Sequence, residues 1–152
     1  KYALQNRNAM ADAILKSNGL EQRDRFDTVH NYIDLESMIA RKGAISAKEG
    51  EKLVIPFNSR DGSVIAKGKG NEDWNQSAPH GAGRTMSRTQ ARKRIPYQKY
   101  QEMMKDVYTT SVSHRTLDEA PTAYNEQKKI LKLAEPTIDV LEFIRPIYNL
   151  KG

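Results

Sequence analysis

Apolar and polar residues follow two different periods along this chain, and the change of period predicts both helices and strands. Residues 2–16 are rich in Ala, Leu, Gln and Met, which favour a helix, and the Asn-Gly pair at 18–19 fits its end. Residues 27–36 instead place apolar and polar side chains on alternate sides. This alternation is typical of a half-buried strand. The sequence therefore opens with a predicted helix followed by a predicted strand.

The same criteria divide the rest of the chain into short elements. Strands are predicted at 38–47, 52–55, 63–67, 108–112 and 138–148, of which the last also fits a helix. Helices are predicted at 85–93, from Pro96 onward and at 123–133, and an acidic loop at 116–121. In the helix from Pro96 the residues at core spacing are Tyr97, Tyr100, Met104 and Val107. We expect one α+β domain, or part of one, with mixed sheets and flanking helices.

The chain has a net positive charge and no cysteine, which excludes thiol chemistry. The 152 residues carry 25 Lys and Arg against 19 Asp and Glu, a net charge of +6, which favours polyanionic partners such as RNA or nucleotides. There is no cysteine, so neither a disulfide nor a thiolate metal site is formed by this chain. No apolar run approaches about 18 residues and no signal peptide is evident. We expect a cytoplasmic protein with no membrane partner.

The run from 77 to 84 combines residue types that suit phosphate chemistry. His80 stands between a proline and a Gly-x-Gly turn, and Arg84 follows directly. Imidazole attacks phosphorus well when one ring nitrogen is free and a partner holds the other. Gly81 and Gly83 can turn backbone N–H groups toward an anion. The alternative is a histidine that makes a structural hydrogen bond in a glycine-rich turn, and the residues alone favour neither.

Further polar residues have both structural and functional interpretations. His30 lies on the polar side of a predicted strand and could bind a divalent metal, but spacing favours a plain strand histidine because no second ligand is nearby. Residues 84–99 hold six cations and no acid. Arg84, Arg88 and Arg92 recur every four residues, so we expect them on one helical face that suits a phosphate backbone or is simply solvated. We interpret Asp118 and Glu119 as structural.

Several short segments together resemble a known family. In order along the chain, the matching segments are 29–32, 41–44, 68–71, 77–88, 117–121, 123–124 and 151–152. They include the His-Gly-Ala-Gly-Arg run at 80–84 and resemble the C-terminal part of RtcB-type RNA ligases. Members of this family are GTP-dependent and join RNA ends that carry a 3′-phosphate or 2′,3′-cyclic phosphate to a 5′-hydroxyl, in RNA repair or tRNA splicing.

The resemblance implies a role for each matching residue. His80 would attack the α-phosphorus of GTP and hold GMP through a P–N bond, and His30 would be a Mn²⁺ ligand. Asn31 would lie against the nucleotide. Arg84 would help to hold a phosphate. Charge alone, rather than the resemblance, makes the basic face from Arg88 onward, with Arg92, a candidate RNA track. The implied nucleotide-binding residues are Asn31, Pro56, Phe57, Asn58, Ser59, Ser63, Gly81, Ala82, Gly83, Tyr124 and Lys151.

The chain departs from the family pattern in two places. The family's guanine loop commonly carries Gly-Ser where this chain has Phe57-Asn58, which makes guanine selectivity less secure. The family's other metal ligands, an Asp, a Cys and two His, have no match, and the chain opens inside a helical pattern. We therefore expect a C-terminal portion that needs an N-terminal portion as partner and does not ligate RNA alone.

Two other interpretations remain open from the sequence. The chain could be a nucleotide- or RNA-binding module without chemistry of its own. It could also be a structural fragment whose unpaired strands cause self-association, because exposed strand edges invite pairing with another chain.

Overall fold

The computed structural model describes residues 2–149, and its first three-stranded antiparallel sheet has the strand order β1-β2-β5. The strands are β1 (His30–Asp34), β2 (Ile39–Ser46) and β5 (Ser77–Pro79). A bulge interrupts the β1–β2 register between His30 and Tyr32 and places Asn31 at φ 57°. Strand β5 pairs with the other side of β2 and leads directly into His80. The central strand β2 therefore connects the bulge with the candidate nucleophile.

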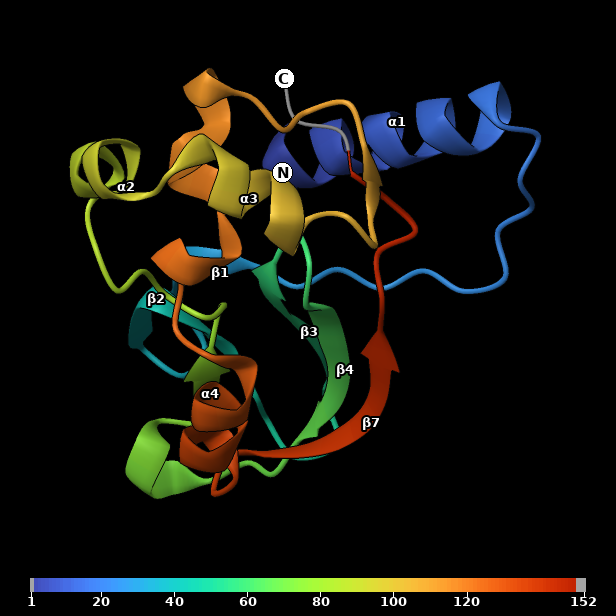
Figure 1. Ribbon diagram of the computed structural model, residues 1–152. Helices are drawn as coiled ribbons and strands as arrows, with labels where there is room; N and C mark the ends of the chain where they lie inside the picture. The colour runs from blue at the N-terminus through green and yellow to red at the C-terminus, as the bar shows by residue number, and fades with distance from the viewer. Residues whose placement is uncertain (1, 150–152) are drawn as a thin grey trace.

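A second antiparallel sheet has the strand order β3-β4-β7 and curves along one side of the molecule (Figure 1). It consists of β3 (Lys52–Asn58), β4 (Gly62–Gly68) and β7 (Ile138–Ile144). The edge strand β7 leaves apolar side chains uncovered, and Phe143 is 57% exposed. A short parallel pair joins β6 (Tyr108–Thr109) to β8 (Tyr148–Asn149). The expectation of self-association through an exposed edge stays a prediction.

The helices lie around these sheets. The helix α1 (Tyr2–Ser17) extends away from the sheets, has no buried residue, and leads into a long irregular segment (Figure 1). The other helices are α2 (Arg88–Arg94), α3 (Tyr97–Met103), α4 (Gln127–Ala134) and the 3-10 helices η1 (Glu72–Trp74), η2 (His114–Glu119) and η3 (Pro121–Ala123). Across residues 2–149, none of the helices combines the length and the apolar character that a bilayer crossing requires.

Two hydrophobic clusters hold the fold together. In the first, apolar residues of both three-stranded sheets pack with Ala134 at the end of α4. Its fully buried large side chains are Ile45, Leu53, Ile55 and Val64. The second cluster packs α2, α3 and η2 around Tyr100 and Met104, each 3% exposed. Tyr124 packs against both clusters. The segment around Tyr124 therefore joins the sheets to the helical layer.

The structure confirms the α+β class and corrects several boundaries. The pattern at 138–148 forms strand β7, so the helical alternative is wrong there. The predicted strand at 108–112 shrinks to two residues, and the predicted acidic loop at 116–121 lies in 3-10 helices. The helix predicted from residue 85 begins only at Arg88, because Ser87 and Gln90 form a capping box. Arg84 therefore lies outside the helix.

Candidate functional site

His80 is held by a backbone carbonyl of the neighbouring strand. Its Nδ1 lies 2.6 Å from the carbonyl oxygen of Gly43 in β2. A carbonyl oxygen only accepts hydrogen bonds, so Nδ1 must be the donor. In the neutral imidazole the proton on Nδ1 leaves the lone pair of Nε2 free. The contact thus selects the tautomer that a nucleophilic histidine needs.

The carbonyl that holds His80 is itself positioned by Asn31. The side-chain Oδ1 of Asn31 accepts a hydrogen bond from the backbone N–H of Gly43 at 2.8 Å. Both residues have left-handed backbones, with φ 57° at Asn31 and 67° at Gly43. Asn tolerates this region better than most residues and glycine better still. Two consecutive hydrogen bonds therefore connect Asn31 in the β1 bulge, through Gly43, to His80.

His30 stacks on His80. The two ring centroids are 5.0 Å apart and the ring planes differ by 19°. The bulge that follows His30 and the β2–β5 pairing bring the two histidines together from opposite sides of β2. No group of three or more His, Asp or Glu side chains with metal-binding geometry occurs within residues 2–149. His30 is therefore placed beside His80, but without further ligands from the described part of this chain.

The Gly-x-Gly turn after His80 fits tightly against β3. The backbone N–H of Ala82 donates to the carbonyl of Pro56 at 3.2 Å, and a Cβ on Gly81 would lie 3.1 Å from that oxygen. Gly83 has φ 66°, and the Asn125 side chain donates to the carbonyl of Ala82 at 2.9 Å. Within residues 2–149, the backbone N–H groups of Gly81 and Gly83 donate to no protein group. They remain available to an anion.

A cavity of about 810 Å³ opens beside this turn. Its lining includes most of the expected nucleotide-binding residues together with His80 and Arg84, namely Pro56, Phe57, Asn58, Ser59, Ser63, Gly81, Ala82, Gly83 and Tyr124. The residues that the sequence did not single out for this cavity are Gly62, Glu119, Ile144, Pro146 and Asn149. Asn31 and His30 do not line it, and Lys151 lies outside the described residues.

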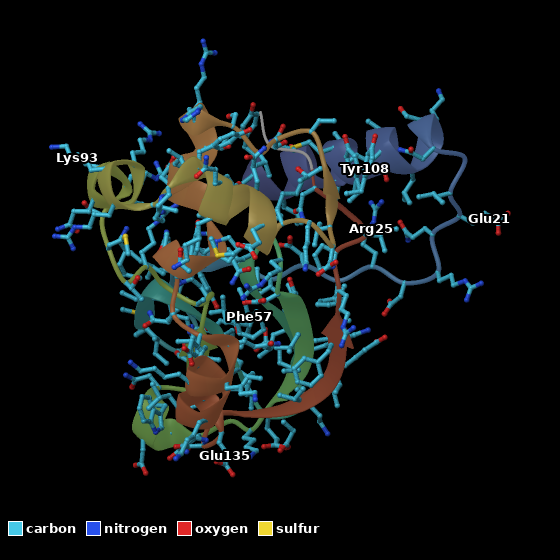
Figure 2. All side chains as sticks on the ribbon, in the orientation of Figure 1. Glu21, Arg25, Phe57, Lys93, Tyr108 and Glu135 are labelled. Carbon is cyan, nitrogen blue, oxygen red and sulfur yellow. The ribbon has the colours of Figure 1, made fainter. Side chains whose placement is uncertain are left out.

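The side chains of the unusual Phe57-Asn58 pair make contacts within the protein. The side chain of Phe57 is 3% exposed and belongs to the first hydrophobic cluster, and Figure 2 shows it in the interior beside β3. The Asn58 side chain accepts from the backbone N–H groups of Arg60 and Asp61 and donates to the Asp61 carboxylate. Both residues line the cavity, and their side chains also stabilise the core and the β3–β4 turn.

Arg84, Glu119 and Tyr124 form one network at the cavity wall. The guanidinium of Arg84 donates to Glu119 at 3.1 Å and to the hydroxyl of Tyr124 at 2.8 Å, and lies 4.6 Å from the Tyr124 ring centroid. The Tyr124 hydroxyl donates to the other oxygen of Glu119. Burial, and then the adjacent Glu119 carboxylate, raises the pKa of Tyr124 to about 12. The tyrosine stays neutral at physiological pH.

The three arginines meet at Asp118 rather than along one helical face. Arg84 donates to the backbone carbonyl of Asp118, while Arg92 and Arg88 approach its carboxylate at 3.0 and 3.6 Å. Burial acts to raise the pKa of Asp118, but the Arg92 hydrogen bond, a backbone hydrogen bond and the charges of Arg92 and Arg84 outweigh it and hold the pKa below its ordinary range. The expected shared face for Arg84, Arg88 and Arg92 is wrong, because Arg84 precedes the helix.

Gly43, Glu119 and Asn125 belong to the site although sequence patterns point to them only weakly. Gly43 lies in a segment that matches the family, but it holds His80 through its backbone carbonyl. Every residue has such a carbonyl, so the residue type gives no signal for this role. The structural interpretation of Glu119 is incomplete, because its contacts with Arg84 and Tyr124 place it at the cavity wall. Asn125 belongs to no recognised motif. The antiparallel β-bridge between Arg84 and Tyr124 brings it next to the Gly-x-Gly turn.

Comparisons with known proteins agree with this arrangement. The family described as tRNA-splicing ligase RtcB matches residues 1–152. The chain is 33% identical over 135 residues to the RNA-splicing ligase RtcB of Escherichia coli strain K12, covering 81% of this chain and 31% of that protein. It is 28% identical over 157 residues to the tRNA-splicing ligase RtcB of Aeropyrum pernix, covering 84% of this chain and 32% of that protein. The chain thus spans about a third of these relatives and belongs to the tRNA-splicing ligase RtcB family.

Proposed function

We propose that this chain is the nucleotidyl-accepting portion of an RNA ligase that joins 3′-phosphate or 2′,3′-cyclic phosphate ends to 5′-hydroxyl ends. The family membership supports RNA ligation, since its relatives are named RNA-splicing and tRNA-splicing ligases. The geometry around His80 supports the chemical step. The single observation that carries the proposal is the hydrogen bond from His80 Nδ1 to the Gly43 carbonyl at 2.6 Å.

In the proposed first step the free Nε2 of His80 attacks the α-phosphorus of GTP. A P–N bond forms, the P–O bond to the β-phosphate breaks, and pyrophosphate leaves. The Nδ1 proton stays hydrogen-bonded to the Gly43 carbonyl, which stabilises the positive charge that develops on the ring. A 2′,3′-cyclic phosphate end is first opened by water to a 3′-phosphate. GMP then passes from His80 to the RNA 3′-phosphate as the P–N bond breaks, and the 5′-hydroxyl attacks that activated phosphate and expels GMP.

The cavity fits a nucleotide. Its volume of about 810 Å³ lies in the range of small-molecule sites. The N–H groups of Gly81 and Gly83 and the Arg84 guanidinium offer donors to phosphate. The hydroxyls of Ser59 and Ser63 and the polar edge of Tyr124 can hold a ribose or a base. When bound, GTP supplies the electrophilic phosphorus and the leaving group.

Residues 2–149 do not make a complete metal site. His30 is the one candidate ligand beside His80, and no group of three ligating side chains occurs within residues 2–149. We propose His30 as one ligand of a Mn²⁺ ion whose other ligands come from the N-terminal portion of the family fold. When bound, the ion would offset negative charge on the phosphate.

The test is intact mass after incubation with GTP and Mn²⁺. We would measure the chain alone and mixed with a second polypeptide that corresponds to the N-terminal portion of an RtcB relative. A mass gain of one GMP that disappears in His80→Ala is the expected result, at least in the mixture. A folded, metal-loaded mixture that gains no GMP contradicts the proposal.

The incomplete metal site favours one alternative for the chain by itself. A nucleotide- or RNA-binding module needs the cavity and its donors but no metal. It predicts that GTP binds the 152-residue chain and that no covalent adduct forms in any mixture. The mass measurement therefore separates the two functions.

A further inference from the structure

A second cavity, of about 530 Å³, lies next to the His80 site and has no role in the proposed reaction. Its apolar lining includes Ile39, Trp74, Ala78 and Leu133. Gly43 and Pro79 also line it, and both adjoin His80: Gly43 accepts its hydrogen bond and Pro79 precedes it. The edge of this cavity is therefore connected to His80 by one hydrogen bond at Gly43 and by one peptide bond at Pro79.

Trp74 is the only tryptophan of the chain and is 55% exposed at this cavity. Its backbone is nevertheless firmly held. The side chain of Asn71 caps η1 and also donates to the carbonyl of Pro136 at 3.0 Å, which ties η1 to the end of α4. An exposed aromatic ring on a fixed backbone loses little conformational entropy when it binds a ligand.

The turn after Trp74 is strained, and a buried arginine stabilises it. Asn75 and Gln76 both have left-handed backbones, with φ 48° and 46°. Arg41 is 4% exposed and donates to the carbonyls of both residues, at 3.2 and 3.3 Å. Two consecutive residues other than glycine in this region are costly, and such strain tends to occur at functional sites. The strained turn and its arginine fix the position of Trp74.

We propose that Trp74 and this cavity bind a nucleobase of the RNA whose 3′-phosphate end reaches His80. This inference rests on the proposed function: an RNA end held at His80 would lie close to Gly43 and Pro79, which line the edge of this cavity. An indole ring and apolar walls suit a base, which stacks through its π face. The acids Glu72 and Asp73 precede Trp74 and disfavour a phosphate beside the ring.

The chain's single tryptophan gives a direct measurement. We would titrate the 152-residue chain, without GTP or metal, with a short RNA that ends in a 3′-phosphate, and record tryptophan emission together with the anisotropy of labelled RNA. We expect saturable quenching of Trp74 that follows the anisotropy, and stronger binding for purine than for pyrimidine ends. Because stacking dominates this contact, quenching should persist when salt weakens the rest of the interface.

Matched variants separate stacking from other effects. Trp74→Ala should weaken RNA binding on the order of 10-fold, and Trp74→Phe should weaken it less, because one aromatic ring remains. The control Tyr2→Ala removes an aromatic ring that is 82% exposed on α1 and should leave RNA affinity unchanged. These variants and the titration require no guanylylation, so they are independent of whether His80 accepts GMP.

Three outcomes overturn the proposal. The first is RNA binding with no change in Trp74 emission, and the second is equal RNA affinity in Trp74→Ala and the unmodified chain. The third is no RNA binding by the folded chain in anisotropy. If Trp74→Ala leaves RNA binding intact but weakens association with the N-terminal portion of the family fold, the cavity is a protein contact instead.

Discussion

The hydroxyl of Tyr124 donates to the carboxylate of Glu119 at 2.5 Å, at the wall of the cavity beside His80. The same carboxylate accepts from Arg84, so one acidic side chain holds both a cation and a ring that face the proposed nucleotide. In this arrangement the guanidinium of Arg84 is already partly neutralised before a phosphate arrives. Glu119 therefore sets both the position and the effective charge of Arg84.

Replacement of Glu119 by Gln should lower the pKa of Tyr124 toward its ordinary value, because the carboxylate charge helps to raise it. Because the pKa of Tyr124 is higher in the folded state, its contribution to the free energy of unfolding is fully present below the ordinary tyrosine pKa of about 10. This contribution is lost as the pH rises from about 10 to the folded value of about 12. Urea unfolding at about pH 9 and about pH 11.5 should show this loss in the unmodified chain and a smaller loss in Glu119→Gln. An equal loss in both chains contradicts the role of Glu119.

The arginines around Asp118 give a prediction about RNA affinity. Asp118→Asn removes one negative charge and releases the side chains of Arg88 and Arg92, which are 70% and 56% exposed. If these arginines follow an RNA backbone, the variant should bind RNA more tightly and show a salt dependence steeper by about one counterion. Filter binding over a range of salt concentrations measures both. Arg92→Ala is the matched control and should bind more weakly than the unmodified chain.

Asp118→Asn should also lose stability, because the buried carboxylate compensates the arginines around it. Its folded pKa is lowered, so its contribution is present above the unfolded pKa and is lost as pH falls through the folded value. We expect a loss of about 1 kcal/mol at neutral pH, since two of its partners are solvent-exposed. The difference between the two chains should shrink at about pH 3. A difference that is independent of pH contradicts this account.

The sequence predicted those parts of the site that depend on short stretches of neighbouring residues. The turn around His80 followed from glycine placement, and the strand at 38–47 from its residue pattern. The nucleotide-binding residues were expected only from the resemblance to the family, and the structure brings most of them to one cavity. The stack of His30 on His80 has no local signal, because it depends on how β1 and β5 flank β2. The arginine prediction is wrong because the i, i+4 spacing takes no account of the cap at Ser87.

The isolated chain should not ligate RNA. Within residues 2–149 the chain offers His30 but no cluster of metal ligands around His80. Incubation of the purified chain with GTP, Mn²⁺ and RNAs carrying 3′-phosphate and 5′-hydroxyl ends should leave both RNAs unjoined on a denaturing gel. A full-length RtcB relative serves as the positive control for the substrates. A joined product formed by this chain, and lost in His80→Ala, would show that the metal site is complete without a second polypeptide.

Asn31 offers the sharpest test of how His80 is positioned. Its Oδ1 accepts from the Gly43 N–H, and the Gly43 carbonyl in turn accepts from His80. Asn31→Gly removes the acceptor but tolerates φ 57°, whereas Asn31→Asp keeps an acceptor at the same place. If Asn31 acts through Gly43, guanylylation in the mixture of both polypeptides should slow roughly 10-fold in Asn31→Gly, with unchanged GTP affinity.

The conservative variant separates this role from direct nucleotide contact. Asn31→Asp should recover most of the guanylylation rate, because a carboxylate oxygen accepts from Gly43 as the amide does. The resemblance to RtcB ligases instead implies that Asn31 lies against the nucleotide. A direct contact would weaken GTP binding in both variants, and most of all in Asn31→Asp, because the new carboxylate repels the phosphates. Equilibrium binding of GTP together with the rate of GMP transfer therefore decides between them. A loss of GTP affinity at an unchanged transfer rate would assign Asn31 to the nucleotide and not to His80.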